Sequence, residues 1–259
     1  MIFLHRTETD RWMINISSGK STAITSFDYD AASEPIVFRG LIFYKDLINK
    51  CWRDNKTFYY IDTGYFGNYK NSANRSGEKR YHRLVKNHVQ HTTYKSGMPD
   101  DRLKKTGVKV SKPVKSGEHI LLVAPSKKPC MFYDIELEDW KAKTLHALKQ
   151  YTDRPIRVRD KASRTKRVAK PIHDEFKNCH AVVTYQSIAA VEAVMAGIPA
   201  FTAEATAADP FTHTDLSQIE TPIYADHDKV YDWASYLSYC QFTIKEIKNG
   251  KAFKILNNE

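Results

Sequence analysis

The sequence has few cysteines, no long apolar run and no internal repeat, and each absence excludes a class of protein. Solenoids and coiled coils need a repeat or a heptad pattern. No window approaches the roughly 20 uninterrupted apolar residues that a membrane-spanning helix needs, and the N-terminus MIFLHRTETDRW has no signal-peptide core. We therefore expect a soluble, cytoplasmic protein without stable membrane insertion.

Cysteine is rare and widely spaced. The chain has four cysteines in 259 residues, and no two of them form a Cys-x-x-Cys pair. This spacing favours reduced, mostly buried thiols over a zinc site or a disulfide framework. The thiols belong to Cys51, Cys130, Cys179 and Cys240.

Acidic residues are outnumbered, with 30 Asp and Glu against 40 Lys and Arg and a net charge of +10. The basic residues concentrate in residues 69–115 and 154–170, so the remainder of the chain is net acidic. Such segregation favours an anionic ligand: a nucleotide diphosphate, a polyanionic acceptor or nucleic acid. Solvated basic loops are the structural alternative.

The stretch from His180 to Thr202, HAVVTYQSIAAVEAVMAGIPAFT, predicts a strand, a polar turn, a short helix and a second strand. Gly197 suits the end of the helix, and Pro199 prevents its continuation. In open α/β sheets ligands bind beyond the carboxyl ends of the strands, where a helix N-terminus presents free N–H groups. A phosphate at Ser187 fits this pattern, and so does a plain helix cap.

The flanking sequence predicts more of the same α/β alternation. Residues 119–124 and 156–159 read as strands and residues 137–151 as a helix between them, which predicts a parallel sheet with helices on its faces. A polar, linker-like stretch places a domain boundary near residue 115. We expect a first domain over 1–115, a second domain over 116–240, and a C-terminal helix over 241–259 that packs back across them.

The N-terminal part also contains a strand with a polar end. Residues 57–61, TFYYI, are rich in β-forming residues and lead into Asp62, Thr63 and Gly64. Nearer the N-terminus, SGKST at 18–22 lacks the preceding glycine of a phosphate-binding loop, because position 14 is isoleucine, and a hairpin turn is expected there.

The motif AVVTYQSIAAVEAVMAGIPAFT, together with WASYLSYCQFTIKEIKNGKAF, resembles glycosyltransferases of the GT-B type, especially phage-encoded and capsule-polysaccharide groups. FYYIDTGYFGN and RYHRLVKNHVQHT resemble segments of the phage-type members. The resemblance implies two small Rossmann-like domains with a cleft between them, with an N-terminal domain shorter than usual. It implies that 1–115 is the acceptor-side N-terminal domain and that 116–240 is the nucleotide-sugar-binding domain. It also implies a metal-independent transferase that uses a nucleotide-sugar, by preference a UDP-sugar, as co-substrate and needs no cofactor.

Charge that develops on a diphosphate leaving group needs cations, hydroxyls and backbone N–H groups around it when no metal is present. The predicted strand ends of the second domain supply these groups. The resemblance further places Glu192 where related enzymes hold the donor ribose, with an exposed helix glutamate as the alternative. The expected donor-binding residues are Ser126, Lys127, Arg157, Arg159, Lys161, Tyr185, Gln186, Ser187 and Glu192.

Sugar transfer with inversion needs a group that takes the proton from the acceptor hydroxyl. Asp62, at a predicted strand end, is the first choice, although an Asp that only caps its own turn is the alternative. His82, His88 and His91 are the other candidates for the base. The spacing of His88 and His91 suits one helix face, but no nearby ligand supports a metal site. The expected acceptor-binding residues are Tyr65, Arg83, Lys86, Asn87, His88 and His91.

Three functions from different classes remain open. The first is a glycosyltransferase acting on a hydroxymethylated pyrimidine in phage DNA, which the basic segments with interspersed aromatics favour. The second is a transferase that acts on a capsular or cell-surface polysaccharide. The third is a non-enzymatic module that binds nucleic acid. A UDP-sugar epimerase is a further enzymatic alternative, although such chains are longer.

Overall fold

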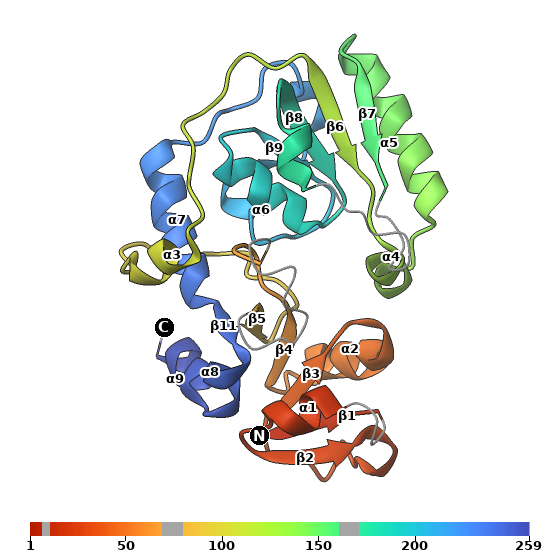
Figure 1. Ribbon diagram of the computed structural model, residues 1–259. Coiled ribbons are helices and arrows are strands. Elements are labelled where there is room, and N and C mark those ends of the chain that lie inside the picture. Colours follow the sequence, from red (N-terminus) through yellow and green to blue (C-terminus); the bar gives the residue numbers. More distant parts are fainter. Residues whose placement is uncertain (7–10, 69–79, 161–170, 259) are drawn as a thin grey trace. The chain divides into compact units, whose positions relative to one another are not determined.

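A computed structural model describes residues 1–6, 11–68, 80–160 and 171–258 (Figure 1). These residues form two compact units. Unit 1 comprises Met1–His91, Lys104–Thr106 and Leu237–Glu259, and unit 2 comprises Thr92–Leu103 and Gly107–Tyr236. The chain is thus an α/β protein with one sheet in each unit, as expected.

Unit 1 is built on a six-stranded sheet with the order β11-β5-β4-β3-β1-β2. The first four strands in sequence are parallel, while β5 runs antiparallel to both β4 and β11. The strands are β1 (Ile2–His5), β2 (Lys20–Ala23), β3 (Ile36–Arg39), β4 (Phe58–Thr63), β5 (Tyr81–Lys86) and β11 (Gln241–Thr243). The helices are α1 (Arg11–Ile16), α2 (Lys45–Arg53), α8 (Ile244–Lys248) and α9 (Lys251–Asn257).

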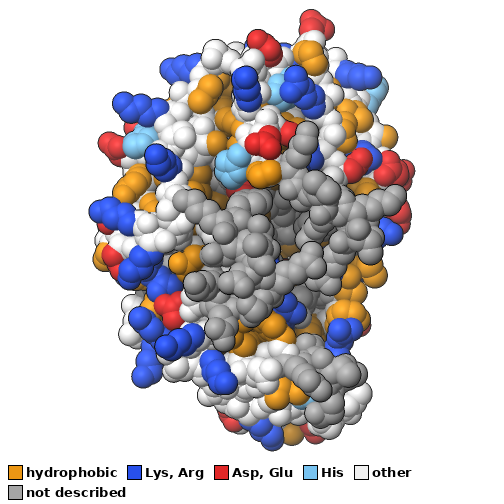
Figure 2. All heavy atoms as spheres, viewed as in Figure 1, with side chains coloured by type: hydrophobic (Ala, Val, Ile, Leu, Met, Phe, Trp, Pro, Cys, Tyr) orange, Lys and Arg blue, Asp and Glu red, His pale blue; other side chains and the backbone are white. Residues whose placement is uncertain are grey.

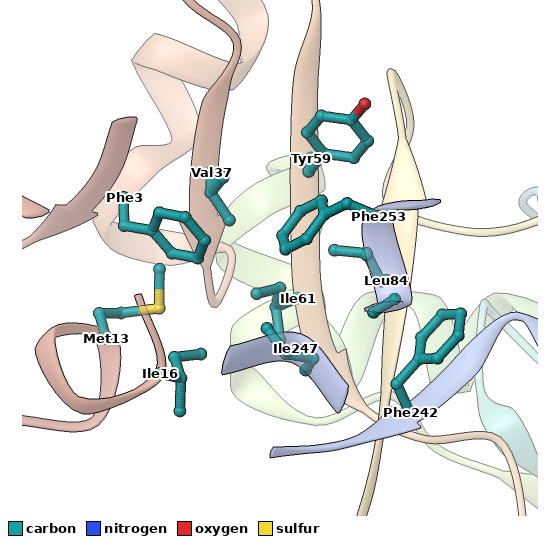
Figure 3. Close-up of a cluster of buried hydrophobic side chains, with 11 residues drawn as sticks. Phe3, Met13, Ile16, Val37, Tyr59, Ile61, Leu84, Phe242, Ile247 and Phe253 are labelled. Carbon is teal, nitrogen blue, oxygen red and sulfur yellow. The ribbon is translucent and has the colours of Figure 1, made fainter. Parts of the chain in front are cut away.

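One face of this sheet carries a cluster of buried side chains that joins the two ends of the chain (Figure 3). Phe253 of α9 contacts Phe3 of β1 and Tyr59 of β4 edge to face, with ring centroids 5.8 and 5.1 Å apart. Ile247 of α8 and Met13 of α1 complete the same cluster. The core of unit 1 therefore cannot form from the N-terminal residues alone.

Unit 2 contains an all-parallel sheet with the order β10-β9-β8-β6-β7. Its strands are β6 (His119–Val123), β7 (Ile156–Arg159), β8 (Cys179–Thr184), β9 (Ala200–Thr202) and β10 (Thr212–His213). Its helices are α4 (Lys127–Tyr133), α5 (Leu137–Tyr151), α6 (Ile188–Met195) and α7 (His227–Tyr239), and α3 (Asp101–Thr106) lies where the chain divides between the units. Short 3-10 turns occupy 24–26, 42–44, 172–175, 209–211 and 216–218.

The α/β alternation predicted for the second half of the chain is confirmed. α5 begins and ends at the predicted residues, and its Leu148 packs on Ile120 and Leu122 of β6. Every residue of α6 from Ala189 to Met195 is buried. Gly197 follows this helix with φ of +77°, the left-handed conformation that its sequence position indicated.

The linker-like stretch before β6 is bonded to unit 2. The Ser111 N–H donates to the Met195 carbonyl at 2.8 Å, and the Val114 N–H donates to the Gly197 carbonyl at 2.9 Å. The structural division therefore runs differently from the boundary near residue 115 that composition indicated. Residues 237–259 belong to unit 1 as a strand and two helices.

Three local predictions were wrong. The segment after residue 80 belongs to the basic region 69–115, where no strand was predicted, but it contains β5, whose His82 and Arg83 are buried. The stretch from Lys20 is not a hairpin, because β2 pairs with β1 in parallel. Finally, no helix contains His88 and His91, so their spacing of three has no helical meaning.

All four cysteines are free and buried, as the spacing indicated. No helix among the described residues is both long enough and apolar enough to cross a bilayer.

The contact between Gly197 and the linker gives a stability test. A Cβ at Gly197 would lie 2.2 Å from the Lys112 carbonyl oxygen, and φ there is +77°. Gly97 has a similar φ of +85° but open space around it. We expect Gly97→Ala to cost about 1 kcal/mol for the backbone conformation alone. Gly197→Ala should cost about 1–3 kcal/mol more, because it also overpacks the linker.

Urea unfolding of both variants measures the difference. Equal losses of stability in the two variants would show that the linker gives way freely and is not part of unit 2.

Candidate functional site

The carboxyl ends of β6, β8 and β9 lie side by side in unit 2. Val123 is the register partner of Thr184, and Thr184 is the partner of Thr202. The Thr184 hydroxyl donates to the Val123 carbonyl at 2.8 Å, which ties two of these ends together. The loops that begin with Ala124 and Tyr185 therefore start at one edge, where ligands bind in open α/β sheets.

Aromatic side chains frame the turn after β8. The Tyr185 ring lies 5.7 Å from the Tyr133 ring and 6.0 Å from the Trp140 ring, in each case edge to face. The Gln186 amide donates to the Tyr133 hydroxyl at 2.6 Å. Burial, and then the nearby Glu204, raise the pKa of Tyr185, which keeps its phenol protonated. Sequence reasoning did not single out Tyr133, and it placed Trp140 only within the helix predicted over 137–151.

Ser187 acts as the N-cap of α6. Its hydroxyl oxygen accepts the Ala189 N–H at 3.2 Å, so the capping alternative for this serine is correct as a local role. Four residues along the helix from Ile188, Glu192 is only 7% exposed, which excludes the alternative of an exposed helix glutamate. The turn thus combines a capped helix start with a buried carboxylate on the same helix.

The predicted cations differ in their position relative to this edge, in their exposure and in their ion pairing. Lys127 is the exposed first residue of α4, directly after Ser126. Arg159 ends β7, but its guanidinium forms an ion pair with Glu175. Arg157 pairs with Leu121, two residues before the strand end, and Lys161 lies outside the described residues. Lys127 is therefore the predicted cation that is both exposed and beyond the end of its strand.

In unit 1 the corresponding edge contains a buried ion pair. The Arg83 side chain is only 7% exposed, whereas that of Asp62 is 40% exposed. Arg83 Nη2 lies 3.5 Å from Asp62 Oδ2, and Nη1 donates to the Thr63 carbonyl at 3.2 Å. The Tyr60 hydroxyl donates to Asp62 Oδ2 at 2.7 Å, and the Thr63 N–H donates to Oδ1 at 2.7 Å. Asp62 therefore caps its own turn and also has an exposed portion.

Several opposing effects act on the Asp62 carboxyl. Burial raises its pKa, but the Arg83 charge and the hydrogen bonds from Tyr60 and Thr63 outweigh burial, so the pKa is below its ordinary value. Burial also raises the pKa of Tyr60, which stays a hydrogen-bond donor. Asp62 is consequently an anion at neutral pH.

Tyr65 and His91 join this cluster. The Tyr65 hydroxyl and His91 Nδ1 are 2.8 Å apart, and the Arg83 guanidinium lies 5.7 Å from the Tyr65 ring. Burial, and then the Arg83 charge, lower the pKa of His91 to about 3. The buried Gln241 side chain holds the turn, because its carbonyl oxygen accepts the Tyr65 N–H at 2.8 Å. Sequence reasoning missed Gln241.

His82 lies on the other side of the same strand end. Its ring meets Trp12 at 4.9 Å, and the Arg39 guanidinium lies 4.1 Å over the Trp12 ring. Burial, and then the charge of Arg39, lower the pKa of His82 to about 4, so the imidazole is neutral. Its buried Nε2 has no hydrogen-bond partner among the residues described.

The remaining predicted acceptor residues lie elsewhere. Lys86 pairs with Tyr59, at the opposite end of β4 from Asp62, and binds the Asn257 side chain at 3.0 Å. Asn87, with φ of +56°, closes a turn by accepting the Phe58 N–H. His88 bonds to the backbone of Gln90. The structure therefore gathers Asp62, Tyr65, Arg83 and His91 but separates Lys86, Asn87 and His88 from them.

No group of three or more His, Cys, Asp or Glu side chains among the described residues is arranged to hold a metal ion.

The sequence matches no protein-family model and none of the curated proteins. The fold is similar to that of KpsC, a beta Kdo 2,4 transferase from Thermosulfurimonas dismutans, with a TM-score of 0.51 and 9% identity over 91% of this chain and 90% of that chain. A KpsC beta Kdo 2,7 transferase of the same organism gives a TM-score of 0.45 and 10% identity over 99% and 98%. The first similarity establishes the GT-B-like, Rossmann-like α/β fold.

The ion pair predicts a pH-dependent stability. Asp62→Asn leaves the buried Arg83 without its counter-charge, so it should lower the free energy of unfolding at neutral pH. The folded pKa of Asp62 is below the unfolded value of about 3.9. The stability advantage of the wild type over Asp62→Asn is therefore complete above that value, and it is lost as the pH falls through the pKa of Asp62 in the folded state. Urea unfolding of both proteins across this range measures it.

Arg83→Met is the matched control. It removes the positive charge that lowers the pKa of Asp62 against the effect of burial. The pKa of Asp62, followed by NMR, should therefore rise. A stability difference between wild type and Asp62→Asn that does not change with pH would contradict the ion pair.

Proposed function

We propose that this protein is a metal-independent glycosyltransferase that moves a sugar from a nucleotide-sugar to an acceptor hydroxyl. The observation that carries the proposal is the polar turn Tyr185–Ser187, which lies between the end of a buried parallel strand and the start of a buried helix. The fold similarity to a sugar transferase supports it.

In the proposed donor site, unit 2 holds the nucleotide-sugar at the carboxyl ends of β6 and β8. The N-terminus of α6 and the exposed ammonium of Lys127 stabilise the negative charge that develops on the leaving phosphate. Glu192 would hold the ribose hydroxyls. The ring of Tyr185, fixed by Tyr133 and Trp140, provides a flat surface beside the turn.

Asp62 is the proposed base. Its carboxylate is ionised at neutral pH and held by Tyr60, Thr63 and Arg83, so it is already oriented to accept a hydrogen bond from an acceptor hydroxyl. A lowered pKa makes it a weak base. It therefore takes the proton late, as the new C–O bond forms and the hydroxyl becomes acidic.

We favour a saccharide over DNA as the acceptor. A duplex acceptor needs several cations placed along one phosphate backbone. Among the described residues, Arg83 is buried in an ion pair and Lys86 lies at the other end of its strand. A hydroxymethylated pyrimidine in DNA remains the second candidate because of the net charge of +10.

The direct test is an assay of nucleotide release with a panel of UDP-, GDP- and CMP-sugars. The acceptors are oligosaccharides, hydroxymethylated DNA and unmodified DNA. We expect release that depends on a saccharide acceptor. Release that needs hydroxymethylated DNA and falls steeply with salt would replace the saccharide by DNA. No release with any pair would reject the transferase.

Two sets of variants separate the proposed roles. Asp62→Asn should keep donor binding and lose at least about 100-fold in turnover. Lys127→Ala and Tyr185→Ala should weaken donor binding, measured by calorimetry, whereas Lys143→Ala on α5, which removes a similarly exposed lysine, should not. Loss of donor binding in Asp62→Asn would contradict its role as a base.

A further inference from the structure

A pocket of about 480 Å³ lies in unit 1, away from the candidate catalytic edge. Its volume is within the range of small-molecule sites. Residues near the chain end and the β1–β2 connection form this pocket. It is lined by Met1, Ser18, Lys248, Asn249, Gly250, Phe253, Lys254, Asn257 and Asn258.

The sheet register fixes where this pocket lies. Met1 precedes β1, and Ile2 is level with Ile36 of β3, which is level with Phe58 of β4. Asp62 is four residues further along β4, a rise of about 13 Å. The pocket is thus at the amino-terminal edge of the sheet, and Asp62 is at the carboxyl-terminal edge.

The lining that the structure describes contains two lysines and no carboxylate side chain. Lys248 and Lys254 are exposed, and neither forms an ion pair with any residue that the structure describes. Lys86 adds a third ammonium, because its Nζ lies 3.0 Å from Oδ1 of the pocket residue Asn257. Glu34, an acidic residue nearby, is bound to the N-terminal ammonium. Figure 2 shows basic side chains gathered over the C-terminal helices.

The rest of the lining includes three asparagine amides and one serine hydroxyl. The side-chain oxygen of Asn249, Oδ1, accepts the Lys251 backbone N–H at 3.1 Å. The side-chain NH2 group of Asn249 is therefore left to donate elsewhere. The Ser18 hydroxyl oxygen is shielded from solvent and has no hydrogen-bond partner among the described residues. Phe253, the aromatic residue of the lining, is 4% exposed and lies against Tyr59 in the core (Figure 3).

We propose that this pocket binds an anionic saccharide, with its carboxylate between Lys248 and Lys254 and its hydroxyls on the side-chain amides of Asn249 and Asn258. Ammonium groups neutralise the carboxylate, while side-chain amides both donate and accept hydrogen bonds, as sugar hydroxyls require. Single-stranded nucleic acid fits less well, because it needs exposed rings on which bases stack. This site is distinct from the donor turn and from Asp62, and its binding does not depend on transfer activity.

Calorimetry with trigalacturonate on the full chain at low ionic strength tests the proposal. Lys248→Ala/Lys254→Ala should weaken binding by about tenfold or more, since two cation contacts are lost. Lys245→Ala/Lys251→Ala removes two exposed lysines from the same helices outside the pocket lining and should leave binding unchanged. An equal loss in this control pair would show general attraction and overturn the site.

A second variant blocks the pocket without removing a charge. Asn258→Trp puts an indole at the rim near the chain end, so it should weaken trigalacturonate binding while the thermal unfolding curve stays the same. Asp62→Asn should bind trigalacturonate as wild type does, which separates this site from the proposed transfer reaction.

Neutral maltotriose and a short single-stranded oligonucleotide are the competing probes. We expect maltotriose to bind more weakly than trigalacturonate, since it has no carboxylate. Absence of trigalacturonate binding, or tighter binding of the oligonucleotide, would overturn the proposal.

Discussion

Burial of the Arg83 guanidinium is the constraint on which the organisation of unit 1 depends. A buried cation is tolerated only when it is paired and hydrogen-bonded. Asp62 and the Thr63 carbonyl meet this need from β4, and the rings of Tyr60 and Tyr65 lie 5.6 and 5.7 Å away. The requirement fixes how β4 pairs with β5, and it also makes the Asp62 carboxylate anionic and oriented.

The same strand explains why the end of the chain returns to its beginning. β5 pairs with β4 on one side and with β11 on the other, where Gln241 is the register partner of Arg83. Gln241 then closes the turn after Asp62 through its side chain. The segment that follows β11 covers the sheet face with Ile247 and Phe253, and its residues 248–258 provide most of the pocket lining. One pairing therefore supports both the proposed catalytic edge and the proposed saccharide pocket.

The sequence predicted those elements whose residues follow a simple pattern. Apolar runs ended by Gly or Pro located β6 and the unit from β8 to β9, because burial on both faces leaves little room for polar residues. An apolar stripe at helical spacing located α5. The strand β5 was not predicted from the sequence, because its buried His82 and Arg83 are stabilised by partners that are distant in sequence. Aromatic neighbours such as Tyr133 gave no local signal for the same reason. The predicted donor and acceptor roles depend on ligands, which spacing alone does not reveal.

The central claim is that the carboxyl edge of the unit 2 sheet binds the nucleotide of an activated sugar. Backbone amide NMR during titration with UDP, CMP and GDP tests it directly. The account predicts that at least one nucleotide shifts the resonances of the turn from Tyr185 to Ala189 and of the loop from Ala124 to Lys127. Shifts confined to unit 1, or no shift with any of the three nucleotides, would contradict it.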